Sequence, residues 1–306
     1  MKVLVATEKP FAAVAVKGIK EALESAGIEM ALLEKYAQKQ ELLDAVKDAD
    51  GLIIRSDIVD AEVLAAADRL KIVVRAGAGY DNVDLEAATA KGVCVMNTPG
   101  QNSNAVAELV FGMAVMMVRN MYNGTSGTEL KGKKLGIHAY GQVGRNVARI
   151  AKGFGMEVYA FDPYCSDAAM LADGVTPLHC VEELYTTCPI VSLHIPATAE
   201  TKKSINYELM SKMPKGALLL NTARKEVIDE EGLARILEER PDFRYAADVA
   251  PAIAETLNAQ FAGRVFFTPK KMGAQTSEAN INAGIAAAKQ SAGFLKEGID
   301  RFRVNK

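Results

Sequence analysis

A glycine-rich segment near the middle of the chain has the residue types and spacing to bind a dinucleotide. Residues 136–144 read Gly-Ile-His-Ala-Tyr-Gly-Gln-Val-Gly and join an expected strand to an expected helix. Gly141 would let the backbone approach a pyrophosphate, and Gly144 would let the helix pack closely on the strand. The N–H groups at the helix N-terminus would hold the phosphate charge. The sequence therefore predicts a cofactor-binding turn made of Tyr140, Gly141, Gln142, Val143 and Gly144.

Two further positions refine this prediction. Asp162 ends the next expected strand, 18 residues beyond Gly144, close to the spacing of a carboxylate that accepts ribose hydroxyls and repels a 2′-phosphate. NAD is therefore favoured over NADP. Position 139 holds Ala where the first glycine of the fingerprint belongs, which is a mild departure if Ala139 keeps a negative φ. Glycines alone also fit an ordinary turn, so the prediction rests on strand, turn, helix and Asp162 together.

Composition and charge restrict the other function classes. The 306 residues carry 36 basic and 38 acidic side chains, so the whole molecule has no electrostatic reason to bind nucleic acid or an anionic membrane. The apolar run 109–118 is too short to span a bilayer, and the four apolar residues after Lys2 are too few for a signal peptide. Four cysteines without C-x-x-C spacing suit a reducing cytoplasm, and three dissimilar histidine positions argue against a metal site.

Short β-branched runs alternate with helix-period segments, which predicts an α/β fold with two Rossmann-like or flavodoxin-like doubly wound parallel-sheet domains. Pro and Gly breaks near residues 97–100 and 268–273 predict a discontinuous substrate domain, 1–98 plus 274–306, around a cofactor domain, 99–273. The main expected helices are 13–26, 103–119, 143–153, 229–240 and 277–296. The expected strands are 2–6, 28–33, 51–55, 71–75, 93–96, 134–139, 157–161, 190–194, 217–221, 244–248 and 265–268.

Motifs spread along nearly the whole chain resemble the D-2-hydroxyacid dehydrogenase family, and within it the D-3-phosphoglycerate dehydrogenases. The resemblance implies a first domain that binds substrate, a middle domain that binds NAD, and homodimers formed through the NAD domain. Besides the glycine turn, the matching motifs are Ile54-Arg55-Ser56, residues 75–84, Pro99-Gly100-Gln101-Asn102, Ala107-Glu108, residues 192–198, Asn221-Thr222-Ala223-Arg224, Asp248-Val249 and Gly273-Ala274.

The resemblance assigns substrate-binding roles to several positions. Arg224 would pair with the substrate carboxylate and α-oxygen, a task that suits a guanidinium because it keeps its proton and binds bidentately. Arg55, followed by Ser56, would bind a phosphate. Backbone N–H groups of Gly77, Ala78 and Gly79 would hold the carboxylate, and Asn102 would lie near substrate and nicotinamide. Simpler interpretations stay open: solvated arginines, an ordinary turn at 77–79, and an N-cap at Asn102.

The same resemblance extends the NAD site beyond the glycine turn. It implies that His194 lies at the nicotinamide end of the cofactor cleft, although a half-buried structural histidine is an open alternative. His138 and His179 are interpreted as structural. The other positions that the resemblance places at the cofactor are Pro196, Thr201, Thr222, Ala223, Asp248 and Gly273.

The chain departs from the family pattern at the proton carrier. Lys271 stands where the family has its catalytic histidine, and Ile253 stands where the family has the paired carboxylate. A carboxylate would raise a lysine pKa, whereas an apolar neighbour and nearby Arg224 would lower it toward neutrality, where proton transfer works best. We therefore predict that Lys271 is the general acid/base, as in a subgroup of phosphoglycerate dehydrogenases with lysine here. Lys270, Glu255, and a merely solvated Lys271 are the alternatives.

These residues predict NAD-dependent oxidation of D-3-phosphoglycerate to 3-phosphohydroxypyruvate, which in the family is the first step of serine biosynthesis. With Lys225, the cations Arg55, Arg75, Arg224 and Lys271 would give a near-neutral protein one cationic cleft. A glyoxylate or hydroxypyruvate reductase of the same family, and a non-catalytic NAD-sensing interaction protein, are the alternative functions. The methionines at 113, 116, 117 and 121 are expected to pack in the core or a dimer interface.

Overall fold

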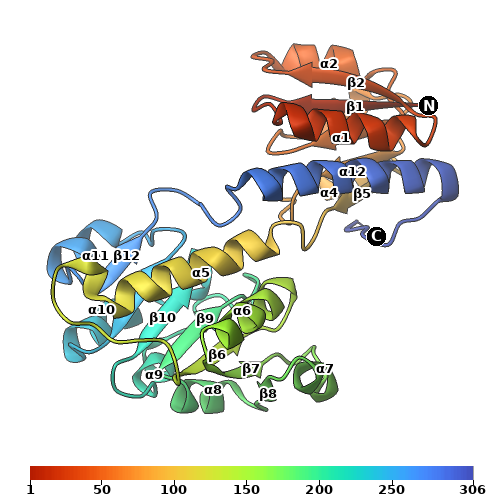
Figure 1. The fold of residues 1–306 in the computed structure, drawn as a ribbon. Coiled ribbons are helices and arrows are strands. Elements are labelled where there is room, and N and C mark those ends of the chain that lie inside the picture. Colours follow the sequence, from red (N-terminus) through yellow and green to blue (C-terminus); the bar gives the residue numbers. More distant parts are fainter. Residues whose placement is uncertain (306) are drawn as a thin grey trace. The chain divides into compact units, whose positions relative to one another are not determined.

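The computed structural model describes residues 1–305 and divides into two compact units. One unit joins Met1–Asn102 with the C-terminal segment that starts at Gln275, and the other comprises Ser103–Ala274. Each unit contains one fully parallel β-sheet with helices on both faces (Figure 1). The predicted fold class is confirmed.

The first unit has a five-stranded sheet in the order β2-β1-β3-β4-β5. Its strands are β1 Lys2–Thr7, β2 Glu29–Glu34, β3 Gly51–Ile54, β4 Ile72–Arg75 and β5 Cys94–Asn97. Its helices are α1 Ala13–Glu24, α2 Lys39–Val46, α3 Ala61–Ala66, α4 Leu85–Ala90 and α12 Ser277–Glu297. This strand order is that of flavodoxin-like sheets, in which ligands bind outside the carboxyl ends of the strands.

Alternating side chains of β1 show how the sheet is buried on both sides. Val3 and Val5 pack in the cluster that contains α1 and α12, whereas Leu4 and Ala6 pack in the cluster that contains α2, α3 and α4. The period of two is the normal consequence of strand geometry. Gly18 lets helices α1 and α12 approach closely. A Cβ at this position would lie only 2.6 Å from Cδ1 of Ile285.

The second unit has a seven-stranded sheet in the order β12-β11-β10-β9-β6-β7-β8. The strand order reverses between β6 and β9, and the ends of these strands are where a doubly wound sheet binds its ligand. The strands are β6 Lys134–His138, β7 Glu157–Phe161, β8 Thr176–Pro177, β9 Ile190–Leu193, β10 Leu218–Asn221, β11 Arg244–Ala247 and β12 Val265–Phe267. The helices are α5 Ser103–Val118, α6 Gln142–Gly153, α7 Asp167–Ala172, α8 Val181–Thr187, α9 Tyr207–Ser211, α10 Glu230–Glu239 and α11 Ala254–Gln260, with 3₁₀ turns at Asn120–Tyr122 and Lys225–Val227.

Every predicted strand is present, and the structure adds the two-residue strand β8. Five strands end one residue earlier than predicted. The residues that leave the ladder are Arg55, Ala139, His194, Asp248 and Thr268. Each begins the loop at the carboxyl end of its strand, which is where the site chemistry was predicted.

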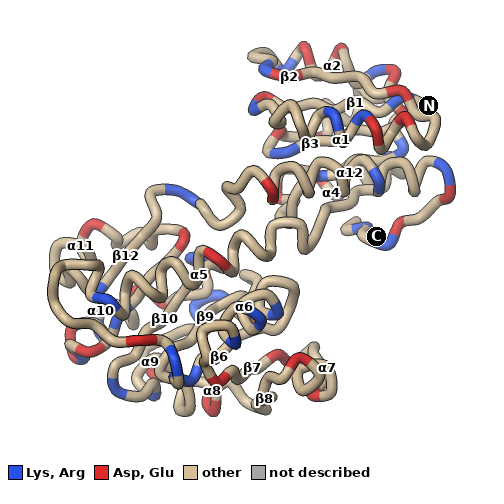
Figure 2. Tube along the Cα trace, viewed as in Figure 1, with Lys and Arg blue, Asp and Glu red and all other residues tan. Residues whose placement is uncertain are grey.

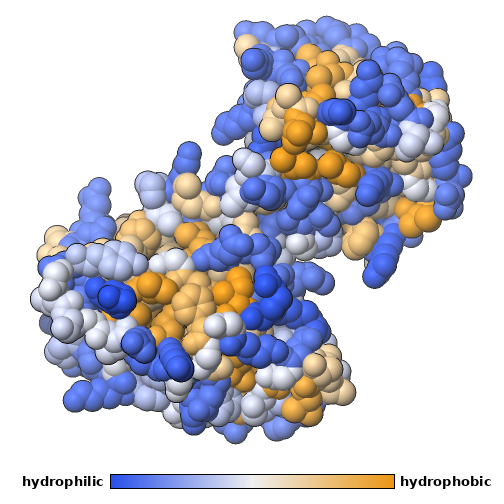
Figure 3. Space-filling model, in the orientation of Figure 1, coloured by the Kyte–Doolittle hydropathy of each residue, from blue (hydrophilic) through white to orange (hydrophobic). Residues whose placement is uncertain are grey.

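The surface and core agree with the composition. Lys and Arg are interspersed with Asp and Glu along the helices and loops of each unit (Figure 2). Hydrophilic side chains cover much of the visible face of each unit, between smaller apolar patches (Figure 3). Met113 and Met117 are buried, and Met116 and Met121 pack against the same cluster, so the methionine group belongs to the core. Within residues 1–305, no helix has the length and apolarity needed to cross a membrane.

Candidate active site

The glycine turn after β6 has room for a phosphate group. Gly141 is the N-cap of α6 and has no side chain that could occupy the helix N-terminus, and a Cβ added there would meet nothing within 4 Å. The first N–H groups of α6, including those of Gln142 and Val143, have no acceptor within the helix. Gly144 lets α6 pack closely on the end of β6, as predicted, because a Cβ there would lie 2.5 Å from the carbonyl oxygen of Ala139. The turn fits a dinucleotide pyrophosphate.

Ala139 adopts the left-handed conformation that glycine usually takes. Its φ is +78°, so the condition under which alanine would be a mild departure is not met. The left-handed conformation lets the N–H of Ala139 stay bonded to the carbonyl of Phe161 while the next N–H, that of Tyr140, turns toward Asp162. A non-glycine residue in this region costs roughly 1–2 kcal/mol, which the turn geometry must offset.

Asp162 fixes the turn while keeping capacity for a further hydrogen bond. Its Oδ2 accepts the N–H of Tyr140 at 2.7 Å, and its Oδ1 accepts the N–H of Tyr164 at 2.8 Å. Each carboxylate oxygen can accept two hydrogen bonds, so the group can also receive a ribose hydroxyl. The ring of Tyr140 is buried and its hydroxyl donates to Asp173, so Tyr140 has only its backbone to offer a cofactor.

The histidines at the ends of β6 and β9 are held in the neutral state. His194 Nε2 lies 2.9 Å from Ser192 Oγ, and its Nδ1 lies 3.4 Å from Thr222 Oγ1. Burial lowers the pKa of His194 to about 3, with a further contribution from His138, and burial lowers the pKa of His138 to about 4 against the opposing effect of Asp162. Neither imidazole is suited to general acid/base catalysis near neutral pH.

The loop after β9 is folded by one threonine. Thr201 Oγ1 donates to the carbonyl of Pro196 at 2.5 Å and accepts the N–H of Thr198 at 2.7 Å. The hydroxyl of Thr201 is thus used within the loop. Pro196 and Thr201 therefore set the shape of this edge of the predicted cofactor site.

Arg224 is positioned by a buried asparagine that the sequence interpretation did not assign to the site. At the end of β10, Asn221 Oδ1 accepts the N–H of Ala223 at 2.9 Å, and Nδ2 donates to the carbonyl of Arg224 at 3.0 Å. The amide also donates to the Tyr245 hydroxyl at 3.2 Å. The Arg224 guanidinium is half-buried and donates to the carbonyl of Ala223, a neutral acceptor. An Asn directly after an apolar strand was the available signal.

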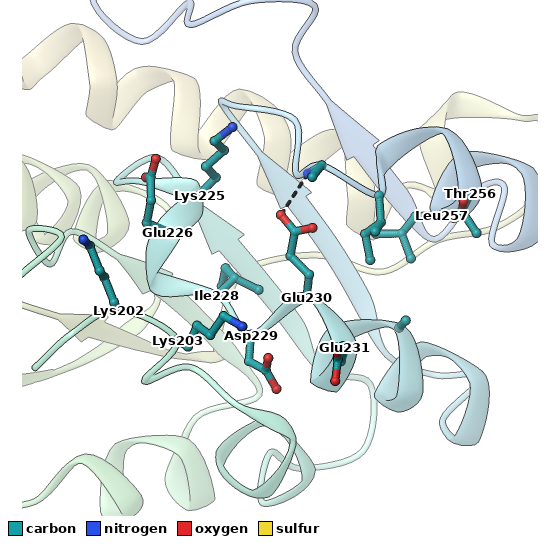
Figure 4. Close-up of a pocket in the computed structure, with 13 residues that line it drawn as sticks. Lys202, Lys203, Lys225, Glu226, Ile228, Asp229, Glu230, Glu231, Thr256 and Leu257 are labelled. Atoms are coloured by element: carbon teal, nitrogen blue, oxygen red, sulfur yellow. Dashed lines mark hydrogen bonds between the residues drawn. The ribbon is translucent and has the colours of Figure 1, made fainter. Parts of the chain in front are cut away.

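An apolar side chain, that of Ile253, stands at the position of the family carboxylate, in a pocket that charged residues also line. This pocket has a volume of about 850 Å³. Lys225, which directly follows Arg224, lines it as well (Figure 4). Glu230 lines the same pocket, and its Oε1 accepts the N–H of Ala252 at 2.8 Å. This carboxylate is tied to the backbone next to position 253. Glu255, the alternative acidic residue, is exposed on α11.

The loop that carries Lys270 and Lys271 is attached to Asp248, which is 2% exposed. Asp248 Oδ1 accepts from Thr268 Oγ1 and from the N–H of Met272, and Oδ2 accepts the N–H of Gly273. Both lysines are exposed residues. The same unit therefore contains the glycine turn, Arg224 and the lysine loop.

The first unit presents two arginines at the carboxyl ends of β3 and β4. Arg55 donates to the carbonyls of Lys9 and Pro10 and, at 2.7 Å, to Asn280 Oδ1. Arg75 Nε donates to the carbonyl of Arg55 at 2.9 Å. Burial lowers the pKa of both guanidinium groups, and the charge of Arg55 adds to the effect on Arg75. The acceptors named here are neutral, so much of the positive charge can interact with an anion.

The turn after β4 requires glycine at its first position. Gly77 has φ +148°, and a Cβ there would lie 1.5 Å from Nη1 of Arg75. Gly77 therefore leaves the space that Arg75 occupies. Ala78 and Gly79 follow in the same turn, Ser56 is exposed next to Arg55, and Asn102 directly precedes α5. These roles in substrate binding stay predictions.

Comparisons with known proteins decide the family. Residues 104–269, over half of the chain, match the family described as D-isomer specific 2-hydroxyacid dehydrogenase, NAD binding domain. The chain belongs to this family. The second unit corresponds to the NAD-binding domain that this family model describes.

Three relatives of this chain show how far the likeness extends. A D-3-phosphoglycerate dehydrogenase of Methanocaldococcus jannaschii is 37% identical over 282 residues, which cover 87% of this chain and 54% of the relative. A hydroxypyruvate reductase of Thermotoga maritima is 33% identical, over 84% of this chain and 88% of the relative. The crystal structure of NAD⁺-bound 3-phosphoglycerate dehydrogenase from Entamoeba histolytica matches 100% of this chain and 99% of that chain, with 50% identity and a TM-score of 0.87. The chain thus spans about half the length of the Methanocaldococcus relative.

The Gly144→Ala substitution tests the cofactor turn. The new Cβ would meet the Ala139 carbonyl at 2.5 Å, so α6 must move away from the turn that positions the phosphate-binding N–H groups. We expect the dissociation constant for NADH, measured by fluorescence titration, to rise at least about tenfold, which corresponds to ~1.4 kcal/mol. Gly153→Ala in the same helix is the control, because its Cβ meets nothing within 4 Å and NADH binding should be unchanged. Equal effects of the two substitutions would contradict this role.

The neutral histidines predict a loss of stability in acid. Because the folded-state pKa of His138 is about 4 and the unfolded value is near ~6.5, the unfolded state binds the extra proton between these values, and stability falls as pH decreases through this window. One such proton contributes a slope of about 1.4 kcal/mol per pH unit. We expect His138→Gln to reduce the slope of unfolding free energy between pH 6 and ~4.5 by about this amount in urea titrations. His179→Gln, a substitution at an exposed histidine, is the matched control.

Proposed function

We propose that this protein oxidises D-3-phosphoglycerate to 3-phosphohydroxypyruvate with NAD, as the first step of serine biosynthesis. The observation that carries the choice of substrate is the adjacent pair Arg55 and Arg75, whose guanidinium groups lose hydration and bond to neutral carbonyl and amide oxygens. Two neighbouring cations with such partners suit the double negative charge of a phosphate. The names of the Methanocaldococcus and Entamoeba relatives agree with this proposal.

The cofactor would be held by the glycine turn, with Asp162 at the ribose and Thr222, Ala223 and His194 at the other end. When bound, NAD supplies the acceptor for the hydride that leaves C2 of the hydroxyacid. Arg224 orients the carboxylate and the α-oxygen, and its permanent charge polarises the oxygen. Backbone N–H groups of Gly77, Ala78 and Gly79 bind the carboxylate, and Arg55 with Ser56 binds the phosphate. Asn102 lies near the substrate.

Lys271 removes the hydroxyl proton in this proposal and returns it in the reverse reaction. The low pKa values of His138 and His194 support this assignment, because neither imidazole is a useful base near neutral pH. The apolar side chain of Ile253 also supports it, since a carboxylate there would stabilise the protonated lysine.

A second candidate function is reduction of hydroxypyruvate or glyoxylate. The Thermotoga relative, named a hydroxypyruvate reductase, favours it because the match covers 88% of that protein. The reaction chemistry is the same and only the need for Arg55 differs.

We also propose that the protein is a homodimer that works in the cytoplasm, in keeping with its four free cysteines.

Replacing Arg55 tests the substrate. We expect Arg55→Ala to lower kcat/KM for 3-phosphohydroxypyruvate by about 100-fold, because two charge-assisted hydrogen bonds to phosphate are lost, and to change kcat/KM for hydroxypyruvate less than about threefold. The assay follows NADH absorbance with each substrate. Arg69→Ala, an exposed arginine of the same unit, is the matched control. Little change with either substrate would favour the reductase, and equal large losses with both would contradict a phosphate-specific role for Arg55.

Replacing Lys271 tests the proton carrier. General acid/base catalysis contributes typically about 10²–10⁴-fold, so Lys271→Ala should lower kcat within this range while the NADH dissociation constant changes little. Lys270→Ala removes an adjacent exposed ammonium group and should leave kcat within about threefold of the unmodified enzyme. The assignment fails if the two variants exchange these behaviours, or if neither affects turnover.

A further inference from the structure

A buried carboxylate holds the lysine loop on both sides of Lys271. Asp248 follows β11, and its Oδ1 accepts from Thr268 Oγ1 at 2.9 Å and from the N–H of Met272 at 2.7 Å. Its Oδ2 accepts the N–H of Gly273 at 2.7 Å. Thr268 precedes the lysines and the two N–H donors follow them. One side chain therefore fixes both ends of the segment 268–273.

These hydrogen bonds are strong by protein standards. Asp248 is 2% exposed, so little water competes for its oxygen atoms. Hydrogen bonds to an ionised carboxylate are shorter and about twice as strong as neutral ones, and distances of 2.7 Å agree with that class. The backbone at Met272 and Gly273 is therefore held more firmly than the backbone of an exposed loop that lacks such hydrogen bonds.

Gly273 shows that this packing requires a particular residue. A Cβ at position 273 would lie 2.8 Å from Asp248 Oδ2 and 3.2 Å from Cγ2 of Val106 on α5. The φ of Gly273 is not in the left-handed range. Glycine is therefore needed here for the close approach of the carboxylate and α5, and not for an unusual backbone conformation.

We propose that Asp248 is a positioning residue that determines where the Lys271 amine stands. This inference rests on the proposed function of Lys271. The lysine side chain has four rotatable methylene groups, so its amine can occupy one productive place only if its backbone is fixed. The role differs from the cofactor contact that the family resemblance implies for Asp248, because the carboxylate acts on the loop and not on nicotinamide.

The two roles predict different kinetic effects of Asp248→Asn. The substitution keeps the shape of the side chain but replaces one accepting oxygen with a donor that faces another donor. A positioning role predicts that kcat falls by about 10- to 100-fold, as expected for the loss of one charge-assisted hydrogen bond, with the NADH dissociation constant within about threefold. A cofactor contact predicts a matching rise in that dissociation constant, and this result would overturn the proposal.

A double-variant cycle separates positioning from general structural damage. If Asp248 acts through Lys271, Asp248→Asn should lower kcat less than about threefold when Lys271 is already Ala. A full additional loss in the double variant would mean that Asp248 supports the enzyme independently of the lysine, and the proposal would be wrong. Thr268→Val is the matched control, since it removes one bond to the same carboxylate but leaves the N–H groups of Met272 and Gly273 attached; kcat should fall less than about fivefold.

Two measurements keep the outcome clear. Circular dichroism and thermal unfolding report whether Asp248→Asn folds. If it does not, Gly273→Ala replaces it, because its Cβ pushes the loop from an intact carboxylate and should lower kcat by a larger factor than it raises the NADH dissociation constant. If Lys271→Ala keeps normal turnover, the proposed function of Lys271 fails. If Lys271→Ala abolishes turnover but Asp248→Asn does not lower kcat, only the positioning role fails.

Discussion

The functional loops of both units depend on one physical requirement: backbone N–H groups that leave a parallel sheet must find new acceptors. A short polar side chain at or just after the end of a strand supplies the acceptor in each case. Asp57 accepts the N–H groups of Glu8 and Arg55 in the first unit. Asp162, Asn221 and Asp248 accept those of Tyr140, Ala223 and Met272 in the second. Because each acceptor lies at or near the end of a rigid strand, its hydrogen bonds fix the loop backbone relative to the sheet.

This requirement also decides the charge that the sites present. The carboxylates of Asp57 and Asp162 are engaged by backbone donors, whereas the guanidinium groups of Arg55 and Arg224 donate to carbonyl and amide oxygens. The negative charges of Asp57 and Asp162 are therefore used to hold loop backbone. Positive charge stays available for an anionic ligand, although the protein as a whole has a formal charge of −2. A local cationic site in a near-neutral protein follows from this division.

Periodic hydrophobic patterns in the sequence predicted the strands and the main helices. They did not show where each strand ends, because local hydrogen bonds decide which residues leave the sheet. The β-branched runs predicted every long strand, but not that Arg55 and Asp248 would leave the ladder. Ala139 shows the limit most clearly, because its left-handed φ is imposed by the acceptors Phe161 and Asp162, which lie across the turn. Strand β8 was missed because two residues, one of them Pro177, carry almost no periodicity. The role of Asn221 was missed because its partners are backbone groups.

The replacement of the family's histidine and carboxylate changes how a proton carrier must be held. An imidazole is a short, rigid group that a neighbouring carboxylate can orient by a direct hydrogen bond. A lysine is long and flexible, and the apolar side chain of Ile253 can offer its amine no hydrogen bond. Fixing the backbone that carries the lysine limits where its amine can stand. The bonds from Asp248 to both ends of the segment 268–273 fix that backbone.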